Sequence, residues 1–500
     1  MSVTNPAPAT TEVQPRPASG LAERVRSALA WRWGTQVLAQ AITWASTILV
    51  VRLLVPADYG LYAMTQAVVT ALAFLNGQSF ATSLIQTDRL DERRIGQVFG
   101  MLLLLNGSLA LAQVLLAPYA ARYYGEPLVA DMLRVQAFIF LTIPFAALPQ
   151  ELLARRIEFR SQGLVNLGCA VVGATTALVL AWQGFGVWAL VWAPVAMFTT
   201  RAIGMTLAAR LLVRPVFDFR GAGDLFTFGG ALTLCQFLWI VQSQADIVIA
   251  GRSFEPHELG LYAEALFLTL IITGRFLPPI NEVAFPTYSE LYKTRQPLGP
   301  FFLRIQRMVA LVVMPAYLGL ALVSGPAVLT LFGEKWAEMA PIAGGLALAM
   351  PAFALQIVCS PATNGMGRPQ TYMATNGAGA VLFPFLFLVG VEAGPWGLVA
   401  AWWIGAPALL VFTWSLTLPQ IGVRWRDLAR ALAPAILSTA IMVAVVTAAR
   451  AALPAMPPPA ELAVLASIGA ATYLAALVLI ARDTVGEIIA FLTRRELSPA

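Results

Sequence analysis

Residues 52–63 read Arg52-Leu-Leu-Val-Pro56-Ala-Asp58-Tyr-Gly60-Leu-Tyr62-Ala63, and the same pattern returns two hundred residues later. Residues 252–263 read Arg252-Ser-Phe-Glu-Pro256-His-Glu258-Leu-Gly260-Leu-Tyr262-Ala263, so arginine, proline, an acid, glycine, leucine, tyrosine and alanine keep their register. Matches continue along the chain at slightly longer offsets: Gly125-Glu126 with Gly333-Glu334, Asn166 with Asn376, and residues 186–191 with 394–399. A repeat of this length predicts two copies of one structural unit.

The composition excludes a water-soluble globular protein. Hydrophobic residues make up 59% of the chain and charged residues only 12%, about half the roughly 25% of soluble domains. The mean hydropathy is +0.74, which is typical of an integral membrane protein with many spans. Cys169, Cys235 and Cys359 lie in apolar runs, and the single histidine is His257. We therefore expect no disulfide, no metal site, no cofactor and no histidine-based catalytic site.

Membrane spans can be located from the length of the apolar stretches, because a helix needs about 20 apolar residues to cross the hydrocarbon core. Short links rich in proline and glycine separate these stretches, as expected for turns. The sequence predicts an all-α polytopic membrane protein with about 14 transmembrane helices: 31–54, 60–85, 96–119, 127–152, 162–183, 186–207, 225–250, 259–285, 303–324, 338–362, 370–391, 394–418, 428–450 and 460–481.

Basic residues indicate which ends of the spans face the cytoplasm. If the N-terminus is cytoplasmic, 25 of the 32 lysine and arginine residues fall in cytoplasmic segments and five in outer segments. This bias predicts that both termini are cytoplasmic. The surplus of basic residues then reflects topology, and we expect no nucleic-acid binding.

The repeat and the spans together predict the domain organisation. Residues 1–25 are expected to be a disordered cytoplasmic segment, because they are rich in proline, threonine and alanine without periodicity. Residues 26–215 form the first six-helix lobe, residues 216–420 the second, and residues 421–500 hold spans 13 and 14 and a cytoplasmic tail. Since six is even, both lobes enter the membrane in the same direction. Such parallel repeats place the substrate site between them.

The repeated motif lies at the outer turn after the first span of each lobe. A proline can end one helix, a glycine allows a close turn, and an arginine can extend to the aqueous phase. Tyr62 and Tyr262 suit the membrane interface. The first interpretation is a turn that defines the fold, and the alternative is a hinge or gate. The candidate gate and hinge residues are Arg52, Pro56, Gly60, Arg252, Pro256, Gly260, Pro278 and Pro279, of which the last two are expected to break span 8.

Span 8 carries a charged stripe. Glu264, Arg275 and Glu282 lie within ~20° of one another on a helix. A charge at mid-bilayer costs at least ~2.5–3.5 kcal/mol, so the stripe must face a cavity or a partner helix in a buried ion pair. The matching positions in the first repeat are uncharged, which favours a function: Met64, Leu75 and Thr82.

Other polar residues fall within spans 1 and 7. They are expected either to line a cavity or to join helices by hydrogen bonds. Asp246 is expected to pair with Arg252 or Arg275. The candidate cavity residues, besides the charged stripe, are Gln36, Gln40, Gln236, Gln242 and Asp246.

The motif of residues 52–63 resembles that of the polysaccharide transporter family of the MOP superfamily. So does the pattern from Gln244-Ala245-Asp246 through Gly251 to Gly260-Leu261-Tyr262-Ala263. This superfamily comprises multidrug, oligosaccharidyl-lipid and polysaccharide exporters, and the chain is similar to its WzxC-like flippases of lipid-linked oligosaccharide. The resemblance covers roughly residues 25–420.

The resemblance implies two MATE-like lobes that alternate between inward- and outward-open states around a cationic cavity. The implied substrate is an undecaprenyl-diphosphate-linked oligosaccharide that crosses the bacterial cytoplasmic membrane for exopolysaccharide or O-antigen synthesis. Arg275 is the candidate for binding pyrophosphate, and Glu264 or Asp246 would release the substrate by competing for its guanidinium. Implied partners are membrane lipids, a polysaccharide polymerase and glycosyltransferases, and the chain is expected to be a monomer.

Other functions remain open on the sequence alone. A MATE-like drug or cation antiporter would use Glu264 and Asp246 as ion sites, and a lipid II flippase would share the fold. An enzyme is not expected, because the longest outer link has only about a dozen residues and cannot carry a catalytic domain.

Overall fold

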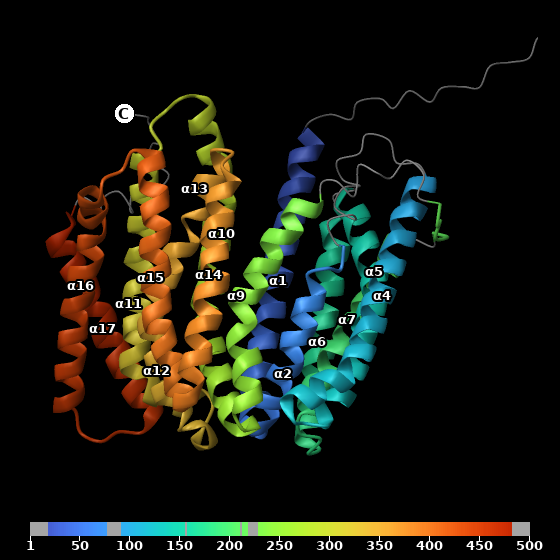
Figure 1. The fold of residues 1–500 in the computed structure, drawn as a ribbon, viewed down its shortest axis with the longest axis horizontal. Coiled ribbons are helices and arrows are strands. Elements are labelled where there is room, and N and C mark those ends of the chain that lie inside the picture. Colours follow the sequence, from blue (N-terminus) through green and yellow to red (C-terminus); the bar gives the residue numbers. More distant parts are fainter. Residues whose placement is uncertain (1–18, 78–91, 156–157, 211–212, 219–228, 483–500) are drawn as a thin grey trace, which may run out of the picture.

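The computed structural model describes residues 19–77, 92–155, 158–210, 213–218 and 229–482, which are almost entirely helical (Figure 1). The side chains of residues 19–30, 32, 229–237 and 369 lie outside this description. No β-strand is assigned in the described ranges, and the predicted all-α fold is confirmed. Helix already begins at Ser19, so the expectation of disorder is wrong for residues 19–25.

The helices fall into two bundles with two helices appended. The first bundle contains α1 Ser19–Leu53, α2 Pro56–Ala73, α4 Glu92–Tyr124, α5 Leu128–Arg155, α6 Phe159–Trp182 and α7 Trp188–Ala209. The second contains α9 Gly229–Ser253, α10 Pro256–Lys293, α11 Gly299–Leu331, η1 Glu334–Trp336, α12 Met339–Ile357, α13 Ser360–Gly365, α14 Pro369–Gly390, η2 Val391–Ala393 and α15 Gly394–Ile421. The appended helices are α16 Trp425–Ala452 and α17 Pro458–Ile480.

Eleven helical stretches of the described chain are long and apolar enough to cross a membrane. One of them, Gln370–Ile421, contains both α14 and α15. The chain is therefore a multi-pass membrane protein, while the number of about 14 spans stays a prediction. The predicted span 60–85 is wrong in detail, because α2 ends at Ala73 and a turn follows. Residues 78–91, and the start of the predicted span 225–250, lie outside the described ranges.

The two bundles use matching helix pairs. In the first, α1 packs on α6, α4 on α5, and α7 on both α5 and α6. In the second, α9 packs on α14, α11 on α12, and α15 on both α12 and α14. These pairs correspond under the sequence offsets and support the parallel repeat, which itself stays a prediction. The appended helices α16 and α17 pack on α11, on the side away from the first bundle (Figure 1).

The main contact between the bundles is made by α2 and α10. Each begins with a proline at its first position, where the missing N–H has no partner to lose. Both helices start at the lower end of Figure 1, which we call the motif end because residues 52–63 and 252–263 lie there. Toward the opposite end, α10 and α14 diverge from α1 and α9 (Figure 1).

Candidate functional site at the seam between the bundles

At the motif end, the two copies of the repeated motif contact each other. A Cβ atom added to Gly60 would overlap the carbonyl oxygen of Pro256, and one added to Gly260 would overlap that of Pro56. Each added Cβ would also lie 3.0 Å from the backbone nitrogen of the other glycine. The contact is therefore reciprocal, and it requires glycine in both motifs because backbone meets backbone there.

The motif arginines reach across the same seam. Arg52, at the end of α1, donates from Nε to the carbonyl oxygen of Leu331 at 3.0 Å and from Nη2 to that of Thr330. Arg252, at the end of α9, donates from Nη1 to the carbonyl oxygen of Tyr123 at 3.0 Å and lies over the Tyr123 ring. The acceptors lie in the last turns of α11 and α4, where helix carbonyls lack intrahelical partners and a cation is favoured.

These two arginine contacts are equivalent under the repeat. Tyr123 lies two residues before Gly125, and Leu331 lies two residues before Gly333, its match in the second repeat. The donors Arg52 and Arg252 also match each other, at the shorter offset of the motif. Each lobe thus caps a helix of the other with its own arginine. Both arginine side chains are exposed, as predicted. The prediction did not include the carbonyl oxygens that they bind in the other bundle.

Trp336 and Lys335 make further contacts across the seam, next to Arg52. Trp336 is buried and donates from Nε1 to the carbonyl oxygen of Val51 at 2.9 Å, and its ring meets Tyr59 edge to face at 5.3 Å. Lys335 donates to the carbonyl oxygen of Leu53 at 3.3 Å. The motif end of the seam is therefore closed by packing, helix caps and hydrogen bonds together.

Arg275 lies on the face of α10 that turns toward the first bundle. Gly260 marks this face by its contact with α2, and Glu264, Arg275 and Glu282 follow within ~60° of it. Arg275 and Glu282 are exposed, beyond the stretch of α10 that α2 covers. Within the described chain Arg275 makes no ion pair, so the alternative of a buried ion pair is wrong.

The charges of the stripe are too far apart to pair. At 1.5 Å per residue, Glu264 lies roughly 16 Å and Glu282 about 10 Å along the helix from Arg275. Arg275 itself lies ~28 Å from Pro256, and a hydrocarbon core of ~30 Å places it near the opposite interface rather than at mid-bilayer. Glu264 lies instead at the α2–α10 contact, close enough to Tyr59 and Tyr62 to interact electrostatically.

The prolines of α10 do not end the helix. Pro278 and Pro279 both lie inside α10, which is helical to Lys293. The predicted break of this helix at Pro278 and Pro279 is therefore wrong. A helix can continue through prolines where neighbouring groups compensate for the lost backbone hydrogen bonds.

Asp246 belongs to a polar chain inside the second bundle. It is 1% exposed, and its Oδ2 accepts a hydrogen bond from the Tyr262 hydroxyl at 2.9 Å. The same hydroxyl accepts from Nε1 of Trp402 at 3.0 Å, which joins α9, α10 and α15. Tyr262 faces ~160° away from Glu264 on α10 and is fully buried, so its predicted place at the membrane interface is wrong.

The hydrogen bonds of Asp246 differ from the predicted ones. Arg252 binds the Tyr123 carbonyl instead, and Arg275 lies ~20 Å along α10 from Tyr262. Neither Asp246 nor Glu264 can compete for the Arg275 guanidinium in this conformation.

The predicted glutamines have different surroundings. Gln36 is exposed, so helix packing does not account for it, whereas Gln40 is half-buried. Gln242 is buried against Gly379 between α9 and α14, not in open space. The Gln236 side chain lies outside the described residues.

Sequence reasoning missed the side chains that partner the motifs. Tyr123 could have been found from its spacing to the matched glycines, because the arginine and its acceptor repeat together. Trp336 follows the matched Gly333-Glu334 pair but has no aromatic counterpart in the first repeat. No sequence signal links Trp402 to Asp246.

Two helical bundles that meet through repeated motifs define a class of membrane transporter. The chain is similar to the solved structure of lipid II flippase MurJ in an inward closed conformation, with a TM-score of 0.70 over 90% of this chain and 100% of that one, at 14% identity. It is also similar to a multidrug resistance MATE family transporter of the MOP superfamily in an inward-facing conformation. There the TM-score is 0.60 over 77% of this chain and 94% of that one, at 15% identity. The predicted MATE-like MOP fold is confirmed.

The chain belongs to the polysaccharide biosynthesis protein family, whose profile matches residues 49–341. It is 25% identical to the succinoglycan biosynthesis transport protein ExoT of Rhizobium meliloti over 66% of this chain and 65% of that protein. It is 21% identical to the lipopolysaccharide biosynthesis protein WzxC of Escherichia coli over 64% of this chain and 66% of that protein. The chain thus spans about two thirds of the length of these relatives, and the predicted resemblance is confirmed.

Proposed function

We propose that this chain is a flippase that moves an undecaprenyl-diphosphate-linked oligosaccharide across the bacterial cytoplasmic membrane for surface polysaccharide synthesis. Its family and the transport role named for ExoT support this proposal. The observation that carries it is Arg275, an exposed guanidinium on the seam face of α10 that makes no ion pair with any described residue.

The chemistry of Arg275 suits the headgroup of such a lipid. A guanidinium matches a phosphate with two parallel hydrogen bonds and keeps its charge at any physiological pH. With both termini cytoplasmic, its position near the interface opposite the motif end corresponds to the level of a diphosphate in the inner leaflet. Arg275 therefore acts at the entrance, where the headgroup first enters the space between the bundles. The exposed Gln36 supplies an uncharged polar wall for the sugars.

The closure at the motif end supplies the second requirement, a gate. In the proposed cycle, the lobes stay joined through Gly60, Gly260, Arg52 and Arg252 while the substrate enters from the opposite end. Separation at the motif end then releases the headgroup into the outer leaflet. Both termini are cytoplasmic in this scheme, and the chain works as a monomer beside glycosyltransferases and a polymerase, without a catalytic step or cofactor.

The test uses a bacterial strain that lacks its own polysaccharide exporter. The full chain should restore surface polysaccharide, Arg275→Ala should lower this about 10-fold or more at equal membrane abundance, and Arg275→Lys should lower it less. Full activity of Arg275→Ala would remove the assignment of the site. Rescue of a strain that lacks its lipid II flippase, or uptake of organic cations driven by an ion gradient, would replace the proposed substrate.

A further inference from the structure

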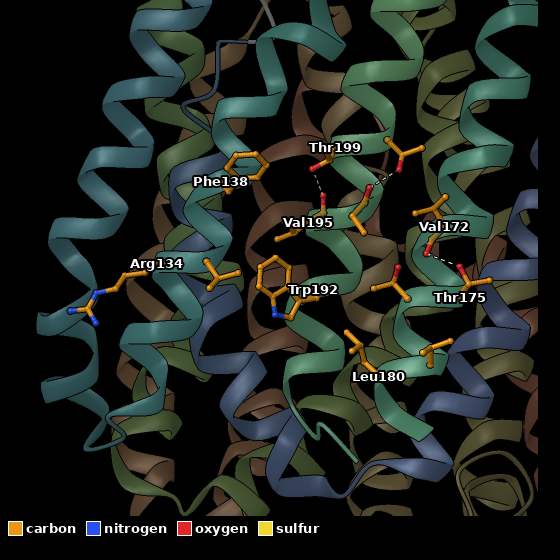
Figure 2. Close-up of a pocket in the computed structure, with 13 residues that line it drawn as sticks. Arg134, Phe138, Val172, Thr175, Leu180, Trp192, Val195 and Thr199 are labelled. Carbon is orange, nitrogen blue, oxygen red and sulfur yellow. Dashed lines mark hydrogen bonds between the residues drawn. The ribbon is translucent and has the colours of Figure 1, made fainter. Parts of the chain in front are cut away.

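A large cavity of the described chain lies outside the seam. It is a groove of about 1060 Å³ lined only by residues of α5, α6 and α7 in the first bundle (Figure 2). Ala174 marks the side of α6 that meets α1, because its carbonyl oxygen accepts a hydrogen bond from Ser46. Thr176 and Val179 line the groove from the opposite side of α6, ~140–200° around the helix from Ala174. The groove therefore opens on the side of the bundle that faces away from α1.

The walls of this groove are apolar despite their threonines. The hydroxyl groups of Thr175, Thr199 and Thr200 donate to carbonyl oxygens one turn back in their own helices, at 2.8, 2.7 and 2.8 Å. Figure 2 shows the bond from Thr199 to Val195 and a second bond of Thr175, to the Val172 carbonyl oxygen at 3.1 Å. These three threonines thus present methyl groups, which do not suit a sugar but suit a hydrocarbon chain.

The depth of the groove matches one leaflet. It extends from Trp192 to Thr200 on α7, eight residues or ~12 Å, and starts about one turn from the motif end. Half of a ~30 Å hydrocarbon core has a similar depth. With the predicted topology this is the outer leaflet.

The one charged residue among those that line the groove is Arg134, and its ion-pair partner Asp131 lies one turn earlier on α5. Arg134 lines the groove near the motif end and pairs with Asp131 at 2.7 Å, with both side chains about half exposed at 50% and 59%. Such exposed pairs contribute little to stability, so each partner is free to engage a ligand. A phosphate suits Arg134, and an ammonium group suits Asp131.

The second bundle shows that the groove is a feature of one lobe. The corresponding α12–α15 surface holds a cavity of only about 230 Å³, partly filled by Trp403, whose Nε1 donates to the Gly345 carbonyl at 2.7 Å. By the repeat offsets, Trp403 matches Val195 and Phe385 matches Thr175. At these two positions the first bundle thus has smaller side chains where the second has aromatic ones.

From this geometry we infer that the α5–α6–α7 groove binds a zwitterionic phospholipid of the outer leaflet. The acyl chain lies along the threonine methyls, the phosphate binds Arg134 and the ammonium group binds Asp131. The substrate's diphosphate carries no ammonium group, so this site is distinct from the proposed transport path. It does not depend on the transport function.

The site can be tested by lipid retention. The full chain, purified in mild detergent with equal amounts of phosphatidylethanolamine and phosphatidylglycerol, should retain phosphatidylethanolamine in native mass spectrometry. Val195→Trp and Thr175→Phe copy the second bundle into the groove and should each abolish this retention. Leu207→Trp, at a position 71% exposed on α7 outside the groove, is the matched control and should retain the lipid.

Two further variants test the headgroup assignment. Asp131→Asn should remove the preference for phosphatidylethanolamine over phosphatidylglycerol, and Arg134→Gln should weaken retention of both lipids. If Val195→Trp and Thr175→Phe retain as much lipid as Leu207→Trp, the groove is not the binding site. If the retained molecule is phosphatidylglycerol or a polyprenyl lipid, the proposed occupant is wrong.

Discussion

The helices α2 and α10 occupy matching places in the two bundles, begin with the same proline, and then differ in length. α2 ends at Ala73 after 18 residues, whereas α10 continues to Lys293 for 38 residues. Their shared part forms the reciprocal glycine contact, and the extra length of α10 carries Arg275 and Glu282. The symmetric part of the repeat therefore builds the closure, while the candidate substrate chemistry lies where the repeats depart from each other.

The symmetric part can be broken at its glycines, for which we expect the largest effect. Gly60→Ala and Gly260→Ala each place a methyl group against a backbone carbonyl of the other motif. Overpacking typically costs about 1–3 kcal/mol, and the upper end applies where the methyl group meets backbone, so each variant should shift the lobes toward separation at the motif end by roughly 100-fold. The distance between spin labels at the exposed residues Gln183 and Glu392, one in each bundle, reports this shift.

The control for this pair is Gly274→Ala on α10, where an added Cβ meets nothing within 4 Å. It should leave the label distances unchanged. Because the two glycine contacts are reciprocal, Gly60→Ala and Gly260→Ala should have equal effects. A large effect from only one of them would contradict the symmetric closure.

The asymmetric part can be tested by moving its charge. Leu75 is the counterpart of Arg275 but lies in the turn after α2. Charge-assisted hydrogen bonds are worth roughly 1.5–3 kcal/mol, so Arg275→Leu should lower polysaccharide export about 10-fold or more. Adding Leu75→Arg should not restore export, because the arginine would then lie on the wrong element. Restoration would show that only net charge matters.

The sequence predicts the symmetric features well and the asymmetric ones poorly. The repeat spacing singled out Gly60 and Gly260 as turn residues at one end of the bundles, because hydrophobic length and turn chemistry are local, although it did not predict that the two motifs contact each other. It did not predict that α2 stops at Ala73 or that α10 continues through Pro278 and Pro279, since both depend on packing. Nor could it pair Asp246 with Tyr262, because that pairing depends on the rotation of two helices about their axes.

The buried polar chain gives a smaller contrast between the lobes. Tyr262→Phe would leave the buried Asp246 carboxylate and the Trp402 N–H without their shared partner, at a cost of about 1–3 kcal/mol. At the matching place of Asp246 the first lobe has Ser46, and the Tyr62 hydroxyl makes no hydrogen bond within the described chain. Tyr62→Phe should therefore leave the melting temperature unchanged, while Tyr262→Phe should lower it. Equal effects would contradict a stabilising role for the hydrogen bonds among Asp246, Tyr262 and Trp402.

The smallest expected effects come from the arginine caps, because both guanidinium groups are exposed. A hydrogen bond of this kind contributes about 0.5–1.5 kcal/mol, so removing a cap should favour separation at the motif end by about 2- to 10-fold. Arg52 donates to two carbonyls and Arg252 to one, so Arg52→Ala should have the larger effect in the same label measurement. The two caps share no residue, and their effects on one equilibrium should add in the double variant. A double variant no worse than Arg52→Ala alone would mean that the closure is held from one side only, despite the symmetry of the repeat.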